Sequence, residues 1–434
     1  MNRFIFFLIL FNFFTGCSFN SNSEFWTSSK DIDLENTNYK KILLKKEITL
    51  DKDFNPNLKI KLNSKYNKDL FDYLQSNNYG RIDYDGELKK ISRYRFSKID
   101  NFHKYEPEIS FFKDDIIFFD NKGSILKFDN KSKLIWKKNF YSKSEKKLNP
   151  ILQFSNNENF LIVADNIAKS YMLDLKSGNL IWSKSNLAPF NSQIKIYKDK
   201  FFVVDFSNTL RCFSLKDGSE LWNIRTENSL IRSPKKLSMV IVEDNIYFNN
   251  SLGDITAVNI NEGQLLWQLP TQSSLIYQSA FSLEISDLVA DNNSLYFSNN
   301  KNQIFSIDLK TGTFNWETNV NSNIRPTIIE NLLFTVSLEG YLIVIQKNSG
   351  NIIRITDVFD NFKSKKRSKI LPVGFVIGVK NIYLSTSNGR LLVIDITTGK
   401  TKSTLKVDNE KISRPLIINN NLFIIKDNAI IKLN

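Results

Sequence analysis

Few residues in this chain carry side chains that commonly do chemistry. Its 434 residues include one histidine, His103, and two cysteines, Cys17 and Cys212. One histidine excludes a multi-histidine metal site, and two distant cysteines exclude a cysteine-rich one. No glycine-rich phosphate loop opens a helical pattern. The sequence therefore gives no positive evidence for catalysis, a metal or a cofactor, and we expect a protein that is not an enzyme.

Carboxylates are plentiful, but the regularly spaced ones belong to turns. A polar side chain stands four residues before each of six glycines, where Asp, Asn and Ser accept hydrogen bonds from the amides of a turn. The polar residues are Asp174, Ser214, Asn259, Asp308, Gln346 and Asp395, and the glycines are Gly178, Gly218, Gly263, Gly312, Gly350 and Gly399. We interpret this pattern as turn chemistry.

Five of the six tryptophans belong to the same recurring phrase: Trp136, Trp182, Trp222, Trp267 and Trp316. The last two copies have Arg354 and Ser403 instead, and the six glycines lie 38 to 49 residues apart. Repetition at this period, with several short strands per unit, is typical of a β-propeller. We expect the tryptophans to fill the gaps between adjacent blades, the alternative being a platform for stacking a ligand.

The unit around Gly312 shows how the repeat builds a blade. Residues 294–298 read as a strand, and 303–309 alternate with period two, which presents two faces to two environments. The chain then turns at Gly312, because a short hairpin with a bulge needs one residue at positive φ. Residues 314–319 form the outer strand.

Counting these units gives eight blades. Seven turns are visible, and the chain ends in three strands whose missing outer partner we assign to residues 85–91. Joining both termini in one blade removes an exposed edge. Seven blades would result if the C-terminal strands were only a cap. We divide the chain into a leader (1–16), a lipidated N-terminus and tether (17–80) and the propeller (81–434), with a strand at 43–50 and a helical turn at 68–75 as minor candidates.

The N-terminus predicts export. A positively charged start is followed by an apolar run from Phe4 to Phe14 and then by Thr15-Gly16-Cys17. The apolar run is too short to span a bilayer. It resembles a bacterial lipoprotein signal, which implies acylation of Cys17 and, with Ser18 next, transport to the outer membrane. The alternative is an ordinary signal with an incidental cysteine. By its place in the repeat we expect Cys212 at a narrow position in the core, where a free cysteine acts as a small apolar residue.

The net charge of +14 invites a nucleic-acid interpretation. We reject it, because the lysines are scattered and the leader directs the chain away from nucleic acid. One dense cluster spans residues 363–369. It is either a solvated loop or a contact for anionic lipid or an acidic partner.

The repeat resembles that of quinoprotein-type propellers, which include pyrroloquinoline-quinone dehydrogenases and the BamB family of outer-membrane β-barrel assembly lipoproteins. The dehydrogenases carry an adjacent cysteine pair and calcium-binding acids, and this chain has no adjacent cysteines. The resemblance to BamB covers residues 85–434. It implies a lipoprotein on the periplasmic face of the outer membrane, without a cofactor, that binds the POTRA domains of a BamA-type insertase and helps unfolded barrel precursors reach it.

Two segments resemble the partner surface of that family. Residues 229–234 resemble a Leu-x-Leu-Arg stretch, which makes Leu230 and Arg232 candidates for partner binding. Residues 283–287 resemble an acidic loop of the same surface, which adds Glu284 and Asp287. The alternative is that both are ordinary connections between blades. Two other functions stay open: a quinoprotein-like, cofactor-binding propeller, and a propeller that binds a cell-wall or polysaccharide ligand.

Overall fold

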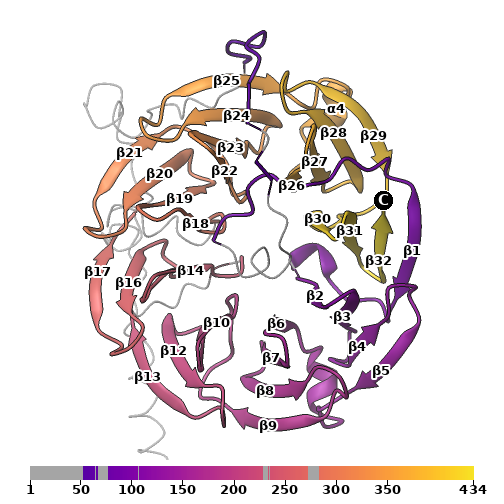
Figure 1. Cartoon of the computed structure of the whole chain (residues 1–434), viewed down its shortest axis with the longest axis vertical. Coiled ribbons are helices and arrows are strands. Elements are labelled where there is room, and N and C mark those ends of the chain that lie inside the picture. Colours follow the sequence, from indigo (N-terminus) through magenta and orange to yellow (C-terminus); the bar gives the residue numbers. More distant parts are fainter. Residues whose placement is uncertain are drawn as a thin grey trace, which may run out of the picture. The chain divides into compact units, whose positions relative to one another are not determined.

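The computed structural model describes residues 52–63, 65–66, 77–105, 107–227, 233, 235–271 and 283–434. In this part of the chain, eight four-stranded antiparallel sheets stand as blades around a central axis (Figure 1). The predicted all-β, eight-bladed propeller is confirmed, and the seven-blade alternative is wrong. The candidate strand at 43–50 and helical turn at 68–75 lie outside the described residues.

The blades follow one another along the chain, each running from the centre outward. The first four are β2 (Ser110–Phe112), β3 (Asp115–Phe119), β4 (Ile125–Phe128) and β5 (Leu134–Lys138); β6 (Leu152–Asn156), β7 (Phe160–Asp165), β8 (Lys169–Asp174) and β9 (Leu180–Ser185); β10 (Lys195–Tyr197), β11 (Lys200–Val204), β12 (Thr209–Ser214) and β13 (Glu220–Arg225); and β14 (Met239–Val242), β15 (Asn245–Asn249), β16 (Ile255–Asn259) and β17 (Leu265–Leu269).

The fifth to seventh blades repeat this order, and the eighth is completed from both ends of the chain. They are β18 (Val289–Ala290), β19 (Ser294–Asn299), β20 (Gln303–Asp308) and β21 (Phe314–Thr318); β22 (Thr327–Ile329), β23 (Leu332–Val336), β24 (Tyr341–Gln346) and β25 (Ile352–Asp357); β26 (Pro372–Ile377), β27 (Asn381–Thr386), β28 (Arg390–Asp395) and β29 (Thr401–Lys406); and β30 (Leu416–Ile418), β31 (Asn421–Lys426), β32 (Ala429–Leu433) and β1 (Lys90–Arg95).

The period-two pattern of the inner strands serves two neighbouring blades. In β20, Ile304 packs in a cluster with residues of the sixth blade, such as Ile343. Phe305 and Ile307 pack in another cluster with residues of the fourth blade, such as Tyr247. The middle strands are therefore buried on both faces, and their alternation sorts side chains between neighbours instead of between core and solvent.

The ring closes through a strand from the N-terminal part of the chain, as predicted. This strand begins five residues and ends four residues later than expected. β1 pairs antiparallel with β32, from Lys90 opposite Leu433 to Arg95 opposite Ala429. The expected strand at 85–91 is therefore corrected to 90–95. Its first part caps the C-terminus instead, since the N–H of Leu88 donates to the carbonyl of Asn434 at 2.6 Å and the N–H of Asn434 donates to Lys89 at 3.0 Å.

Each of the five tryptophans of the repeat packs against the turn glycine of the next blade. The indole Nε1 of Trp182 donates to the carbonyl of Leu215 at 2.9 Å, and that of Trp316 donates to Lys347 at 2.8 Å. A Cβ on Gly218 would lie 2.6 Å from the ring of Trp182, and Gly218 has φ +69°. Glycine is thus required both for the turn and for the ring above it. The tryptophans seal the seams between blades, as predicted.

Three seams lack a tryptophan, and Arg354 and Tyr94 take its place at two of them. At the sixth seam Arg354 is fully buried, and its Nη1 donates to the carbonyls of Leu58, at 3.0 Å, and Thr397, at 2.5 Å. Burial lowers the pKa of Arg354 to about 10. At the ring closure the hydroxyl of Tyr94 donates to the carbonyl of Asn130 at 3.0 Å, in the place of an indole.

The turn carboxylates act as predicted. The Oδ1 of Asp308 accepts hydrogen bonds from the N–H groups of Lys310, at 3.0 Å, and Thr311, at 2.8 Å. The hydrogen bond from the N–H of Thr311 makes the largest contribution to lowering the pKa of Asp308. The carboxylates of these residues stabilise the turns by accepting hydrogen bonds from backbone amides.

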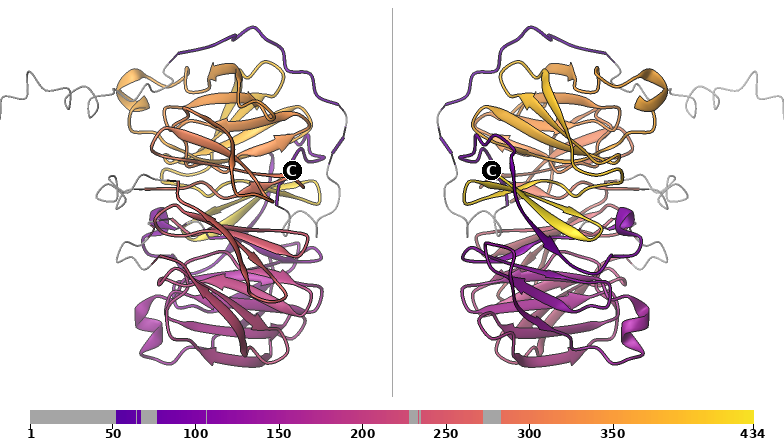
Figure 2. Two further views of the ribbon diagram at one scale, coloured as in Figure 1. Left: turned by 90° about the vertical axis from the view of Figure 1, so that its left-hand side faces the viewer. Right: turned by 90° about the vertical axis from the view of Figure 1, so that its right-hand side faces the viewer.

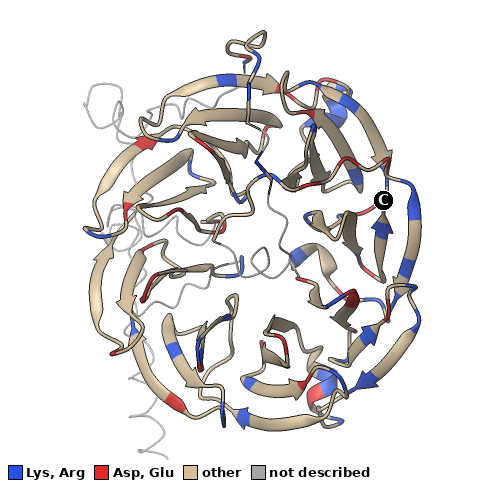
Figure 3. Cartoon of the chain, viewed as in Figure 1, with Lys and Arg blue, Asp and Glu red and all other residues tan. Residues whose placement is uncertain are grey.

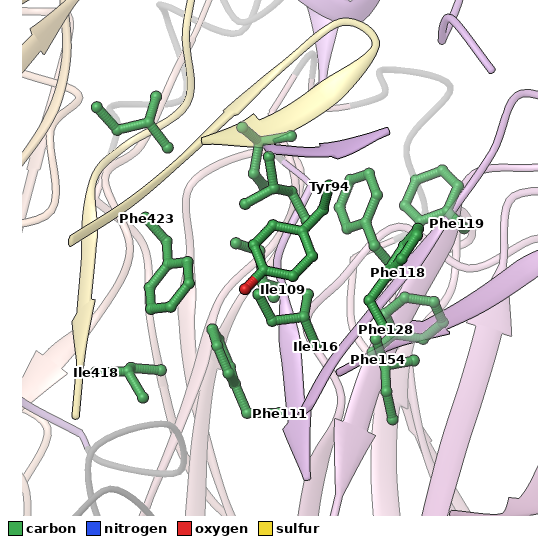
Figure 4. Close-up of a cluster of buried hydrophobic side chains, with 14 of the residues drawn as sticks. Tyr94, Ile109, Phe111, Ile116, Phe118, Phe119, Phe128, Phe154, Ile418 and Phe423 are labelled. Atoms are coloured by element: carbon green, nitrogen blue, oxygen red, sulfur yellow. The ribbon is translucent and has the colours of Figure 1, made fainter. Parts of the chain in front are cut away.

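The core is aromatic where the ring closes. Phe423 of β31 meets Phe111 of β2 with ring centroids 5.3 Å apart, and Phe119 of β3 meets Phe154 of β6 at 5.9 Å (Figure 4). These contacts tie the last blade to the first two. Basic and acidic residues are spread around the whole ring (Figure 3). Among the described residues, no helix is long and apolar enough to cross a membrane.

Part of the expected tether lies against the propeller. Phe54 and Ile355 exchange two backbone hydrogen bonds, of 3.1 and 2.9 Å, at the outer edge of the sixth blade. The N–H of Ile60 donates to Thr397 at 2.9 Å in the seventh blade. Residues 77–84 run past the inner strands of the fifth to seventh blades before β1 (Figure 1). The described N-terminal segments are thus part of the folded body.

Candidate partner-binding face

One face of the propeller carries the connections from each outer strand to the inner strand of the next blade; we call it the mouth face. The short helices η2 (Phe102–Lys104), η3 (Glu145–Leu148) and α4 (Ser364–Arg367) all lie on it (Figure 2). A cavity of about 1110 Å³, the mouth, opens at its centre. Its lining comes from successive blades and includes Lys104, Asn166, Asn191, Ser233, Glu284, Asn323, Ser387 and Asn409.

Each of the two segments singled out in the sequence has a described residue in the lining of this mouth. Ser233 and Glu284, which precede β14 and β18, both line it. The Nζ of Lys235 donates to the carbonyl of Asn323 at 2.6 Å, and the Nδ2 of Asn323 donates to the carboxylate of Glu284. Three consecutive blades are joined here. Asn323 belongs to neither motif, so the only sequence signal for it is its place before the inner strand β22.

The backbone of Glu284 is held in place by the neighbouring turn. Its N–H donates to Oδ1 of Asn300 at 3.0 Å, and the N–H of Asn300 donates to its carbonyl at 3.1 Å. Its half-buried side chain therefore stands at a defined position on the rim, which suits recognition.

The other three predicted residues are placed differently. Asp287 is only 4% exposed, and its Oδ2 accepts a hydrogen bond from Nη1 of Arg414 at 2.8 Å. Burial alone would raise the pKa of Asp287, but Arg414 and Lys235 outweigh it and hold the pKa below its usual value. Asp287 thus faces the interior below the mouth instead of an exposed acidic loop. Leu230 and Arg232 lie outside the described residues.

The described His, Cys, Asp and Glu side chains do not form a cluster of the kind that binds a metal ion. His103 is exposed on η2. Cys212 is fully buried, and burial raises the pKa of its thiol to about 12, which keeps it protonated.

The basic cluster at 363–369 is partly structural. Ser364–Arg367 form α4, and Nη1 of Arg367 bonds to Asp357 at 2.5 Å. The same guanidinium lies 5.2 Å from the ring centroid of Tyr341. Lys363, Lys365 and Lys366 are exposed on the mouth face.

The fold, the seam tryptophans and the open mouth define the class as a PQQ-type repeat propeller. The chain belongs to the family described as outer membrane protein assembly factor BamB, whose model matches residues 121–356. None of the curated proteins compared with the sequence matches it.

Solved structures share the fold at low sequence identity. BamB from Moraxella catarrhalis is 16% identical, with a TM-score of 0.65 over 80% of this chain and 99% of that chain. The computationally designed Ika8 protein is 13% identical, with a TM-score of 0.59 over 78% and 99%. Quinohemoprotein alcohol dehydrogenase from Comamonas testosteroni is 8% identical, with a TM-score of 0.61 over 81% and 78%.

Proposed function

We propose that this chain is a non-enzymatic scaffold lipoprotein of outer-membrane β-barrel assembly. It docks its mouth face on the POTRA domains of a BamA-type insertase and helps barrel precursors reach that insertase. The observation that carries the proposal is the meeting of Ser233, Asn323 and Glu284 at one mouth, in a chain of the BamB family. In this proposal lipid on Cys17 holds the protein on the periplasmic face of the outer membrane.

The mouth suits docking because it combines charge with fixed backbone. Glu284 offers a carboxylate at the rim, and the candidate Arg232 precedes the rim residue Ser233. An arginine with apolar neighbours beside acidic residues is a common hot-spot composition at protein interfaces. Connections held by rigid blades lose little freedom on binding, which favours affinity.

The rim of the ring suits precursors in extended conformation. Exposed apolar side chains, each 43 to 48% exposed, recur on the outer strands of the first five blades: Leu134, Ile135, Leu180, Ile181, Leu221, Leu265, Leu266 and Phe314. Among the described residues each of these strands is the last of its sheet, so its outer edge can pair with a further strand.

The chain itself shows how such pairing works. Phe54 pairs with Ile355, the residue after the seam residue Arg354. By the repeat, Ser183 stands in the equivalent place after Trp182, and its backbone groups point outward in the same way. Every outer strand of the first seven blades has a bulge just before its seam residue, as between Met172 and Leu173 opposite β9. Bulges limit continuous edge pairing, so we expect short, reversible pairing.

Docking is tested by measuring binding to the purified POTRA domains of a BamA-type insertase. Arg232→Glu and Glu284→Lys should each weaken binding at least about tenfold, roughly 1.4 kcal/mol, while the melting temperature barely moves. Lys310→Glu, in an exposed turn on the opposite face, is the matched control. Unchanged affinity in both variants removes these residues from the interface, and a collapsed melting temperature marks the residue as structural.

Precursor pairing is tested at the outer edge. Ser183→Pro removes an outward N–H without touching the bonds to β8. It should reduce crosslinking of β9 to a barrel-derived extended peptide, with the tryptophan fluorescence of the protein unchanged. Equal crosslinking would show that the edge does not pair.

A quinoprotein-like activity is the alternative, favoured by the fold shared with the alcohol dehydrogenase. The chain lacks adjacent cysteines, and its described residues show no acidic cluster for calcium, which supports the scaffold as the first proposal. Saturable quinone binding with dye-linked alcohol oxidation would overturn the scaffold proposal.

A further inference from the structure

A smaller chamber lies below the mouth, on the axis of the propeller. It has a volume of about 90 Å³ and is lined by the ends of the inner strands. One water needs roughly 10–15 Å³ of such space, so the chamber has room for a small molecule in place of several waters.

Residues 77–79 are held beside the chamber, and Tyr79 contributes to its lining. Oδ1 of Asn77 accepts from the N–H of Ile241 at 3.1 Å, and Oδ1 of Asn78 accepts from the N–H of Ile328 at 3.0 Å, which fixes this segment to the fourth and sixth blades. The ring of Tyr79 then lies 3.7 Å from the guanidinium carbon of Arg325. The chamber and the mouth share Lys235, Lys236 and Lys411 in their linings, so the two spaces adjoin.

The walls of the chamber are strongly basic. Among the described residues, six cations line it: Lys195, Lys235, Lys236, Arg325, Lys411 and Arg414. Two acids, Glu108 and Asp287, line it as well. Glu108 lies 3.0 Å from Lys236 and 3.5 Å from Arg414, and Asp287 lies 2.8 Å from the same arginine. The described walls therefore carry more positive than negative charge.

Burial of these cations strengthens their attraction for an anion. Lys195 is 8% exposed and Arg325 is 9% exposed. Burial, with the nearby charge of Arg325, lowers the pKa of Lys195 to about 8. Concentrated positive charge in a cavity with low-dielectric walls attracts anions. Ser155 and Gln193 add neutral polar groups to the lining.

We propose that the chamber binds a small oxyanion, a molecule carrying a carboxylate or phosphate group, which enters through the mouth. The basic walls bring Lys195, Arg325 and Lys236 around one space of suitable size, and Tyr79 lines the same space. This site is separate from the proposed docking at the rim, since a ligand of this size occupies only the chamber below it.

Calorimetric titration of the full mature chain tests the proposal with two probes, inorganic phosphate and citrate, in chloride buffer of constant ionic strength. Glycerol is the neutral control. The expected result is saturable binding of at least one oxyanion with a Kd below about 1 mM. Lys195→Met should weaken it at least about tenfold, while Lys216→Met, an exposed lysine of the same blade, should not. The stronger probe identifies phosphate or carboxylate as the preferred group.

Two further measurements keep the test decisive. If Lys195→Met fails to fold, Lys195→Gln replaces it, and anomalous scattering from soaked tungstate locates the oxyanion directly in a crystal. No binding beyond that of chloride, or equal binding by both lysine variants, overturns the proposal. Loss of oxyanion binding with unchanged POTRA binding leaves the proposed function standing, so the two fail separately.

Discussion

The seam between blades is best tested by adding one methyl group. Gly218→Ala places a Cβ at φ +69°, which costs about 1–2 kcal/mol for a residue other than glycine. The same Cβ would lie 2.6 Å from Trp182, and relieving such overpacking costs about 1–3 kcal/mol more. The free energy of unfolding should therefore fall by about 2–5 kcal/mol.

A double-mutant cycle separates the two terms. In a Trp182→Ala background the ring is gone, so Gly218→Ala should cost only the backbone term of about 1–2 kcal/mol. Urea unfolding followed by circular dichroism measures all four proteins, because fluorescence would change with Trp182 itself. Ser132→Gly is the natural control: Ser132 already has φ +68°, so the change should stabilise by up to about 1 kcal/mol.

The result that would refute this reasoning is additivity. If Gly218→Ala costs the same with and without Trp182, the glycine is required by the turn alone. The tryptophan would then not be packed on the next blade as the structure shows.

Three further predictions concern the sixth seam, the anchor and the chamber. Arg354→Trp should restore the seam seen in five other blades and raise the unfolding free energy by about 1 kcal/mol, since a buried charge is removed. It should also speed tryptic cleavage at Lys59 or Lys61, because Leu58 loses its donor; unchanged cleavage would contradict the role of Arg354. Cys17→Ser should release the processed protein from the membrane fraction with its melting temperature unchanged, and full retention would show another anchor. Burial lowers the pKa of Lys195 from 10.5 to about 8, so the unfolded chain binds more protons between these values and the melting temperature should rise across pH 8 to 10.5. Lys195→Met should flatten that rise; an equal rise in the variant would assign it to other groups.

The repeat made the fold predictable. The strands around Gly312, expected at 294–298, 303–309 and 314–319, lie at Ser294–Asn299, Gln303–Asp308 and Phe314–Thr318. The turn glycine, the polar residue four positions before it and the tryptophan are local signals. They recur around the turn that precedes the outer strand of a blade. The strand that closes the ring shifted from 85–91 to 90–95, because its Asp-Gly-Glu-Leu sequence imitates a blade turn while its backbone caps Asn434.

The site was less predictable, since it is assembled from distant connections. Residues 229–234 and 283–287 were found by resemblance, yet Asn323, which lies between Lys235 and Glu284, has no local signal. Asp287 looked like a surface acid because its partner Arg414 lies 127 residues away. Asn77 and Asn78 looked like a polar tether, because the backbone groups they bind belong to strands far along the chain.

Site-specific photocrosslinking in the envelope tests the central claim most directly. A probe replaces Asn409, an exposed residue that lines the mouth, or Lys310, exposed in a turn on the opposite face. The proposed function predicts a crosslink to the BamA-type insertase from position 409 and none from position 310. A crosslink to that insertase from position 310 alone, or equally from both, would contradict docking through the mouth face.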